Sequence, residues 1–175
     1  MINPIPATYI ETGELSDIED MDRVEQEAFN TPWSRELLRA AILNDQYQVR
    51  VLHSEDVGLL GFYIAHDVKG KSNLDNLVVE GWARNQGHGS TLILDWIEQS
   101  QNLPADMLTL QVNTANKRAQ ALYERFDFRT SRLLVSYYPN GEDAYQMVRA
   151  MDDGEAGAPH SRWQGIRRLR RNLIG

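Results

Sequence analysis

The sequence predicts a mixed α/β (α+β) fold, in which about four helices flank a mostly antiparallel central sheet of about seven strands. Three strand-like runs between residues 48 and 80 follow one another across tight turns, as in an antiparallel meander. Helical and extended periodicities then alternate as far as residue 151. At 175 residues, 42% of them hydrophobic, the chain is long enough for one such domain with a full core.

Hydrophobic spacing and chain breaks predict the elements of the N-terminal half. Residues 6–12 alternate as a first strand. Apolar residues at steps of three to four then predict a helix from Leu15 to Phe29, with its many acids on the outer face. Asn30 to Ser34 break this helix, and Ser34 is suited to cap a second helix that ends at Asn44. The further strands expected here are 48–53, 59–68, which Gly61 should interrupt, and 73–80.

The C-terminal half begins with a glycine-bearing loop and ends with a basic segment. The elements expected after the loop are a helix to about Gln101, a strand at 107–112, a helix at 113–126, and strands at 128–138 and 144–151. We therefore predict one domain over residues 1–151, a flexible linker rich in Gly, Ala and acids over 152–161, and a basic amphipathic tail over 162–175.

Charge is unevenly distributed along the chain. The net charge is −7, yet the stretch from Arg162 to Arg171 carries five arginines and no acid. An acidic body suits soluble behaviour as a monomer or weak dimer, and it attracts cationic substrates. The tail could contact a nucleic acid or a ribosomal surface, touch a membrane, or lie solvated or against its own domain.

Composition excludes several classes of protein. No apolar run approaches the ~20 residues of a membrane span, and no signal peptide opens the sequence. Cysteine is absent, which removes disulfides and thiol nucleophiles and fits a reducing cytoplasm. The four histidines stand apart without metal-ligand spacing, so we expect no metal site.

The segment from Asn76 to Leu94 predicts a strand, a loop with small residues and a helix. Such a loop can hold a phosphate, because its backbone N–H groups and the positive helix start face the anion. A dinucleotide-binding motif is excluded, since Leu92 stands where its third glycine should fall. The P-loop-like Gly70-Lys71-Ser72 is excluded too, because a strand and not a helix follows it.

The loop from Arg84 to Gly89 reads R-x-x-G-x-G, and it resembles the coenzyme A pyrophosphate loop of the GNAT acetyltransferases. The predicted order β-α-α-β-β-β-α-β-α-β-β is similar to the order of that fold over residues 6–151. The resemblance implies a GNAT domain over residues 1–151 and acetyl-CoA as the acetyl donor. For the loop alone, a plain strand–turn–helix with glycines for tightness remains the alternative.

A second motif lies on the helix expected at 113–126. Asn116-x-x-Ala119-x-x-Leu122-Tyr123-x-x-Phe126-x-Phe128 is similar to the family pattern N-x-x-A-x-x-L-Y-x-x-x-G-F. Asp127 replaces the family's glycine at a helix C′ position, where a left-handed backbone is favoured.

Two further segments resemble the N-terminal protein acetyltransferases that modify the alanine terminus of a ribosomal protein. They are the run from Ala28 to Ser34 (A-F-N-T-P-W-S) and the run from Tyr137 to Ala144 (Y-Y-P-N-G-E-D-A) followed by Met147. The resemblance implies that both line the acceptor entrance. The implied acceptor contacts are Trp33, Tyr137, Tyr138 and Glu142. Each has a plainer interpretation: core packing for the tryptophan, strand residues for the tyrosines and a solvated turn for the glutamate.

The same resemblance implies how the coenzyme binds. Leu77 and Val79 would pair with the pantetheine arm through their main chains, and the amide of Leu77 or Val78 would donate to the thioester oxygen. Backbone N–H groups from Gln86 to Gly89 would hold the pyrophosphate. The full set of implied coenzyme-binding residues is Leu77, Val78, Val79, Arg84, Asn85, Gln86, Gly87, His88, Gly89, Ser90 and Asn116.

The catalytic residues are less completely matched. Tyr123 matches the family's general acid, and a phenol of pKa about 10 can protonate a leaving thiolate of similar basicity. The general base of the N-terminal acetyltransferases would fall at Gln111, whose amide cannot take a proton. Gln111 could hold a water while a carboxylate accepts the proton. The candidate carboxylates, in order of preference, are Asp75, expected in register with Leu77 and Val79, then Glu80, then Glu142.

Two alternatives to a displaced base remain. An α-amine of pKa ~8 is about one-tenth neutral at pH 7, a cost near ~1.4 kcal/mol, whereas a lysine side chain costs ~4.6 kcal/mol, so an α-amine could react without a strong base. The chain could also be a weak descendant that only binds the coenzyme. We predict an acetyl-CoA-dependent N-acetyltransferase for a protein N-terminal α-amine, with another amine (a small molecule or modified nucleobase) or a coenzyme A-binding module as alternatives.

Overall fold

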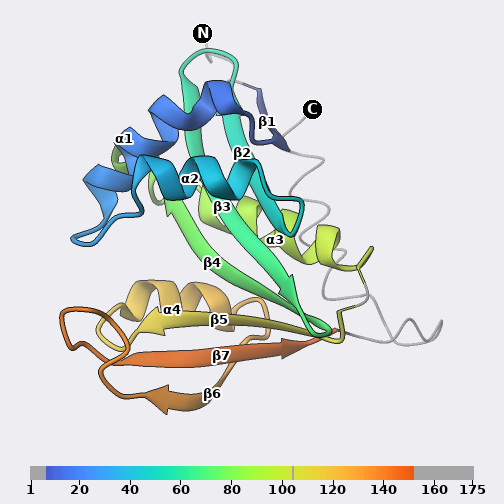
Figure 1. The fold of residues 1–175 in the computed structure, drawn as a ribbon, viewed down its shortest axis with the longest axis vertical. Coiled ribbons are helices and arrows are strands. Elements are labelled where there is room, and N and C mark those ends of the chain that lie inside the picture. The colour runs from blue at the N-terminus through green and yellow to red at the C-terminus, as the bar shows by residue number, and fades with distance from the viewer. Residues whose placement is uncertain (1–6, 104, 152–175) are drawn as a thin grey trace, which may run out of the picture.

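A computed structural model describes residues 7–103 and 105–151 (Figure 1). The predicted linker at 152–161 and basic tail at 162–175 lie outside the described residues, so they stay predictions. Within residues 7–103 and 105–151, no helix is long and apolar enough to cross a membrane.

Seven strands form one sheet in the order β1-β2-β3-β4-β5-β7-β6. Neighbouring strands are antiparallel except β4 and β5, which run parallel. The strands are β1 (Thr8–Thr12), β2 (Tyr47–Ser54), β3 (Gly58–Val68), β4 (Lys71–Val79), β5 (Met107–Asn113), β6 (Arg129–Leu134) and β7 (Ala144–Ala150). The predicted mostly antiparallel sheet is therefore confirmed.

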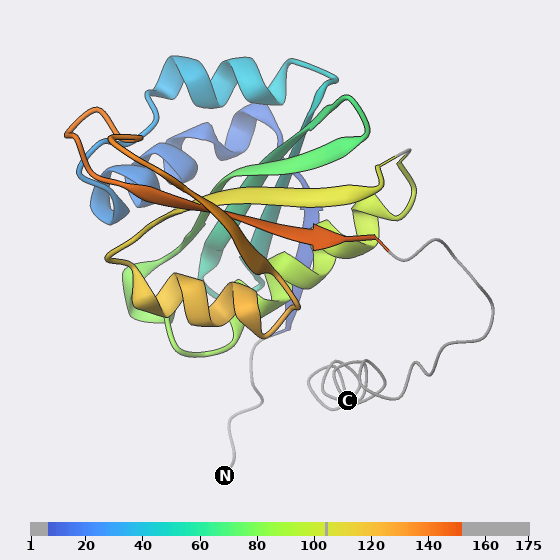
Figure 2. The same cartoon turned by 90° about the horizontal axis from the view of Figure 1, so that it is seen from below.

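Four α-helices cover the two faces of the sheet. They are α1 (Ile18–Ala28), α2 (Arg35–Ile42), α3 (His88–Ser100) and α4 (Lys117–Glu124). Figure 2 shows α1 and α2 on one face of the sheet and α3 and α4 on the other. Each face has its own core: Met21, Leu38 and Phe62 lie in the core under α1 and α2, and Trp96 and Phe128 lie in the core under α3 and α4.

Most expected elements are present, although several differ in extent from the prediction. Ser34 caps α2 as predicted, because its hydroxyl accepts a hydrogen bond from the Leu37 amide. The helix expected at 113–126 begins only at Lys117, since Asn116 caps it, and the strand expected at 128–138 ends at Leu134. Gly61 does not interrupt β3, which runs unbroken from Gly58 to Val68.

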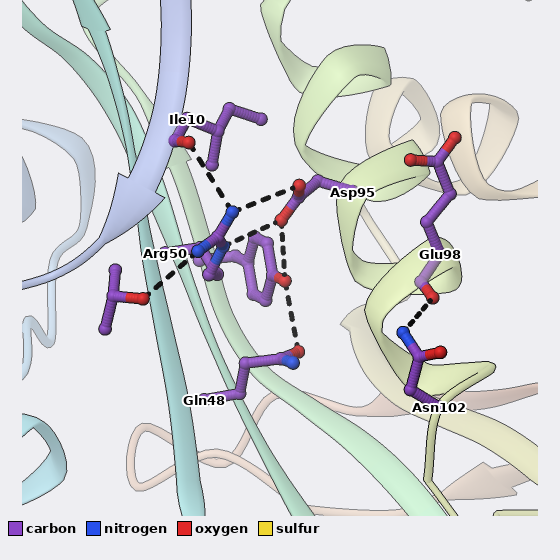
Figure 3. Close-up of polar contacts among 8 residues, drawn as sticks. Ile10, Gln48, Arg50, Asp95, Glu98 and Asn102 are labelled. Carbon is purple, nitrogen blue, oxygen red and sulfur yellow. Dashed lines mark hydrogen bonds and ion pairs between the residues drawn. The ribbon is translucent and has the colours of Figure 1, made fainter.

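A buried polar network ties α3 to the edge of the sheet (Figure 3). Arg50 on β2 donates through Nε to Asp95 of α3 at 3.1 Å and through Nη2 to the Ile10 carbonyl of β1. The Tyr63 hydroxyl of β3 donates to the same carboxylate at 3.0 Å. Because burial and the charge of Asp95 raise the pKa of Tyr63, its hydroxyl stays protonated as a donor. Arg50 and Tyr63 thus join β2 and β3 to the Asp95 carboxylate of α3, and Arg50 also reaches β1.

Gly61 marks the closest approach between β3 and β4. A Cβ atom added there would lie 2.5 Å from the Val78 carbonyl oxygen and 3.1 Å from the Val79 Cα, both backbone atoms. At Gly81, in contrast, an added Cβ would meet no atom within 4 Å. The sheet therefore requires a glycine at position 61, where the sequence had indicated a break.

We expect Gly61→Ala to lower the free energy of unfolding by about 1–3 kcal/mol, because the backbone must move to admit the methyl group. Urea denaturation monitored by circular dichroism measures this loss. Gly81→Ala is the matched control, with an expected change within about 0.5 kcal/mol. Equal stability of the two variants would contradict the close packing of β3 on β4.

Candidate active site

The candidate site lies where β4 and β5 part. Their parallel pairing comprises four residue pairs, from Lys71 with Met107 to Leu74 with Leu110. Beyond these pairs the two ribbons diverge (Figure 1). The rest of β4, from Asp75 to Val79, and the end of β5, from Gln111 to Asn113, flank the opening.

The backbone of β4 presents hydrogen-bonding groups toward this opening. The Glu80 amide donates to the Leu60 carbonyl of β3 at 2.9 Å. Main-chain groups alternate in direction along a strand, so the amides of Leu77 and Val79 turn away from β3 toward the parted side. These are the two residues expected to pair with the pantetheine arm, whereas Val78 lies buried in the core under α1 and α2.

The glycine loop connects this strand to α3 through two left-handed residues. Asn85 has φ 66° and Gly87 has φ 90°, and α3 begins at His88. Glycine adopts the left-handed conformation without steric cost. An added Cβ at Gly89 would lie 3.2 Å from Leu122 on α4, so this second glycine also admits close packing of α3 on α4. The first amides of α3 therefore lie at the end of β4, in a geometry suited to an anion.

The polar side chains around the loop already have protein partners. Arg84 donates through Nε to the Val79 carbonyl at 3.1 Å, and Gln86 donates to the Trp82 carbonyl at 3.2 Å. The Ser90 hydroxyl accepts from Arg125 at 3.4 Å. Burial lowers the pKa of His88. The loop is thus held in shape by its own side chains, and its main chain supplies the positive end of a helix.

The two residues expected from the second motif lie on α4. Asn116 accepts the Ala119 amide through Oδ1 at 3.0 Å, so a coenzyme contact would fall to its Nδ2 group. Tyr123 is buried against Phe128, with ring centroids 6.0 Å apart. Burial, followed by the nearby Tyr138, raises the pKa of Tyr123. Asp127 has φ 65°, the left-handed conformation that the family's glycine predicts.

The predicted acceptor segment between β6 and β7 is fastened to the end of β5. The Asn113 side chain donates to Glu142 at 2.6 Å, and the Thr114 amide donates to the Asp143 carbonyl at 3.1 Å. Tyr137 and Tyr138 meet edge to face, with ring centroids 5.1 Å apart. Burial raises the pKa of Tyr137, and the negative charge of Asp75 raises it further. The charge of Asp75 thus acts on Tyr137, and Tyr138 acts on Tyr123.

Asp75 and Gln111 meet through Asn73. Gln111 donates to the Asn73 Oδ1 at 3.3 Å, Thr109 donates to the same oxygen at 2.7 Å, and Asn73 donates to Asp75 Oδ1 at 2.7 Å. Asp75 Oδ2 contacts Nδ1 of His66 on β3. The pKa of Asp75 is raised, chiefly because the carboxyl group is buried.

The expectation that Asp75 shares the register of Leu77 and Val79 is wrong. The pairing of β3 with β4 shifts between Ile64 and Ala65, which leaves Asp75 as an extra residue of β4. Leu77 and Val79 pack against the core under α3 and α4. Asp75 faces the α1–α2 side instead, as does its neighbour Asn76, whose amide reaches Glu25 on α1 at 2.9 Å.

Two residues of α1 bind Glu80, the second candidate base, and Trp33, in the segment from Ala28 to Ser34. Glu80 is buried and pairs with Arg23 at 2.5 Å. Glu25, which sequence reasoning placed among the outward acids of α1, is also buried. Its carboxylate accepts the Trp33 amide at 3.0 Å and the Asn76 side chain at 2.9 Å. The spacing of the helix indicates this burial, because Glu25 lies four residues after Met21, on the apolar face.

Among residues 7–103 and 105–151, no group of three or more His, Asp or Glu side chains could hold a metal ion. The candidate site comprises the glycine loop at the start of α3, the unpaired stretches of β4 and β5, the buried Tyr123 and the polar side chains around Asp75. Trp33 packs against the core under α1 and α2.

Comparison with known proteins decides the family. The GNAT acetyltransferase domain matches residues 17–150. The chain belongs to the GNAT acetyltransferase family. It is thus an N-acetyltransferase, and the resemblance seen in the R-x-x-G-x-G loop is confirmed.

The relatives point to one branch of that family. The ribosomal protein bS18-alanine N-acetyltransferase of Haemophilus ducreyi is 29% identical over 132 residues, covering 74% of this chain and 88% of the relative. The crystal structure of the Escherichia coli ribosomal-protein-S18-alanine N-acetyltransferase superposes with TM-score 0.77 at 26% identity, covering 87% of this chain and 99% of that one. Arabidopsis thaliana NAA60, crystallised with acetyl-CoA, shares the fold, with TM-score 0.75 at 20% identity over 83% of this chain and all of its own.

The buried Glu25 makes stability depend on pH. Burial raises its pKa above the usual 4.5, and the hydrogen bonds from Trp33 and Asn76 offset this only in part. The folded chain therefore holds this proton more tightly than the unfolded chain. As pH rises above about 4.5, the contribution of Glu25 to stability falls.

We expect the free energy of unfolding of Glu25→Gln, relative to the unchanged protein, to increase between pH 4.5 and 8, because the variant has no charge to bury. Urea titrations at several pH values measure the difference. Glu19→Gln, at an exposed position of the same helix, should change stability by no more than about 0.5 kcal/mol at neutral pH. A difference that does not vary with pH would count against a raised pKa of Glu25.

Proposed function

We propose that the chain transfers the acetyl group of acetyl-CoA to the α-amine of a peptide or protein N-terminus. The observation that carries this proposal is the opening between β4 and β5. On one face it adjoins the anion-binding loop and α3, and on the other it adjoins the row containing Asp75 and Gln111. Donor and acceptor can therefore meet between the strands. The relatives named as bS18-alanine N-acetyltransferases support a ribosomal protein terminus as the class of acceptor.

The residues around the loop fit a pantetheine–pyrophosphate donor. The amides of Leu77 and Val79 face the opening and would pair with the pantetheine arm as a strand does. The Leu77 amide, rather than that of Val78, would donate to the thioester oxygen, because the Val78 amide points toward β3. The amides from Gln86 to Gly89 would bind the pyrophosphate. The donor supplies an activated acetyl group, and these main-chain groups orient it.

Tyr123 would supply the proton that the departing thiolate needs. Its raised pKa keeps the phenol protonated at neutral pH, and Tyr138 borders it on the acceptor side. A phenol and a thiolate differ little in basicity, so proton transfer has a small driving-force penalty. Tyr123 is thus the proposed general acid.

Among the three candidate carboxylates, the contacts favour Asp75 for a part in deprotonation, as the base itself or as the partner of one. Glu80 is neutralised by Arg23, and Glu142 is bound by Asn113 at the end of β5. Asp75 lies two residues beyond Asn73, which Gln111 contacts directly. Its raised pKa brings the carboxyl closer to the range in which a base works at neutral pH. The absence of cysteine is consistent with a reaction in a reducing cytoplasm.

We expect thiol release from acetyl-CoA with peptides that begin with alanine. Peptides with a blocked N-terminus and an internal lysine should react at least about a hundredfold more slowly at pH 7, because lysine costs ~3 kcal/mol more to deprotonate than an α-amine. Polyamines and nucleosides complete the panel and test the other amines. Tight binding of acetyl-CoA without turnover on any acceptor would instead identify a coenzyme A-binding module.

We expect Tyr123→Phe to lower kcat about a hundredfold with little change in KM, because the substitution removes a proton donor and keeps the ring. Initial rates on the best peptide measure the effect. Tyr145→Phe removes a hydroxyl from a half-buried tyrosine of β7 and should leave kcat unchanged. An undiminished kcat in Tyr123→Phe would reject Tyr123 as the general acid.

A further inference from the structure

A row of hydrogen bonds crosses three strands and ends at a histidine. Its donors start on β5, where Thr109 and Gln111 both donate to the Asn73 Oδ1. Asn73 on β4 then donates to Asp75 Oδ1, and Asp75 Oδ2 contacts His66 Nδ1 on β3. Because Asn73 receives two hydrogen bonds on its oxygen, its amide has one orientation, and its nitrogen must point at Asp75.

The sequence singled out Asp75 and Gln111 of this row, but not Thr109, Asn73 or His66. Its side chain is 27% exposed and that of Asp75 is 16% exposed, so the pair is sheltered and still reachable by water. The Tyr47 ring of β2 packs beside the imidazole, with centroids 5.3 Å apart. From the loop between β6 and β7, Tyr137 is close enough to respond to the charge of Asp75. The groups that pair with or contact His66 are therefore Tyr47, Asn73 and Asp75.

The bonds of Asp75 determine what the pair can do. Both carboxylate oxygens are engaged, one by Asn73 and one by His66. A carboxylate that accepts an imidazole Nδ1–H holds the ring in one tautomer and leaves Nε2 with a lone pair. It also stabilises the imidazolium that forms when Nε2 takes a proton. This arrangement makes the imidazole the better proton acceptor and the carboxylate its orienting partner.

We propose that His66, oriented by Asp75, accepts the proton that the acceptor ammonium must lose before it attacks the thioester. The inference rests on the proposed N-acetyl transfer, and it assigns to Asp75 a positioning role. The ammonium N–H bond breaks with its electron pair left on nitrogen, and a new N–H bond forms at Nε2 of His66, with water carrying the proton across. The His66–Asp75 pair passes from a net charge of −1 to zero, and the partly exposed imidazolium returns the proton to solvent.

This assignment accounts for the amide at position 111. Gln111 need not accept a proton, because its contribution is to hold Asn73, which in turn holds Asp75. The alternative is a purely structural contact between β3 and β4. A proton-accepting role and a purely structural role predict different pH dependences of the rate. Only a proton acceptor allows the enzyme to use the protonated amine.

The test is the pH dependence of kcat/KM for an alanine-starting peptide, with the full chain and its His66→Gln variant. We expect kcat/KM of the unchanged enzyme to reach its plateau at a lower pH than that of the His66→Gln variant, because the unchanged enzyme can use the protonated amine. His66→Gln should depend on the neutral amine and keep rising to about pH 8. The variant should therefore be about tenfold slower at pH 7, and the deficit should close above pH 8.

Several controls separate the outcomes. His53 lies on β2, the strand next to β3, and its Nε2 is 3.4 Å from Glu11 and 3.6 Å from Asp17. The His53→Gln variant should retain the pH profile of the unchanged enzyme. His66→Ala should regain rate when imidazole is added, which shows a missing proton acceptor even where the variant is less stable. Acetyl-CoA affinity, measured by calorimetry, should not change in any of these variants.

A His66→Gln profile that runs parallel to the unchanged enzyme at every pH, or His66→Ala without imidazole rescue, would overturn the assignment and leave N-acetyl transfer standing. Absence of peptide turnover in the unchanged enzyme would instead reject the proposed function, and the role of His66 with it.

Discussion

The parallel pairing of β4 and β5 ends after four residue pairs, and the rest of the structure depends on that limit. Beyond Leu74 and Leu110 the two edges have no ladder of their own. An unpaired strand edge has free main-chain hydrogen-bonding groups, and an extended ligand can pair with them. The sheet therefore consists of two antiparallel halves joined at one end, and the proposed donor would lie between them.

Each half is stiffened by its own polar contacts. In the larger half, Asp95 of α3 binds Arg50 and Tyr63, so the helix that begins at the anion site is fixed to β2 and β3. In the smaller half, Asn113 and Glu142 fasten the tyrosine-bearing loop to β5. The bond from Gln111 to Asn73 crosses from one half to the other next to the opening. Each half thus has its own polar contacts, and the Gln111–Asn73 hydrogen bond connects the two halves.

The sequence predicts the order of elements well because helix spacing, strand alternation and glycine turns are local signals. It also locates the anion loop and Tyr123, whose motifs are contiguous. It does not predict which way Asp75 faces, because a register shift between β3 and β4 reverses the alternation there. Neither the burial of Glu25 nor the need for Gly61 follows from local patterns, because both depend on contacts with β4, 17 or more residues away along the chain.

The fixed orientation of the Asn73 amide links positions that are distant in sequence. With a glutamate at position 111, an acceptor would face the Asn73 oxygen, and the amide would have to rotate. The rotated amide would present its oxygen to Asp75 and its nitrogen to Thr109. The Thr109 hydroxyl could accept from the rotated amide, whereas the Asp75 carboxylate would lose a donor and face an oxygen. The cost of an acid at position 111 would therefore fall on Asp75, a residue of the neighbouring strand 36 positions earlier in the chain.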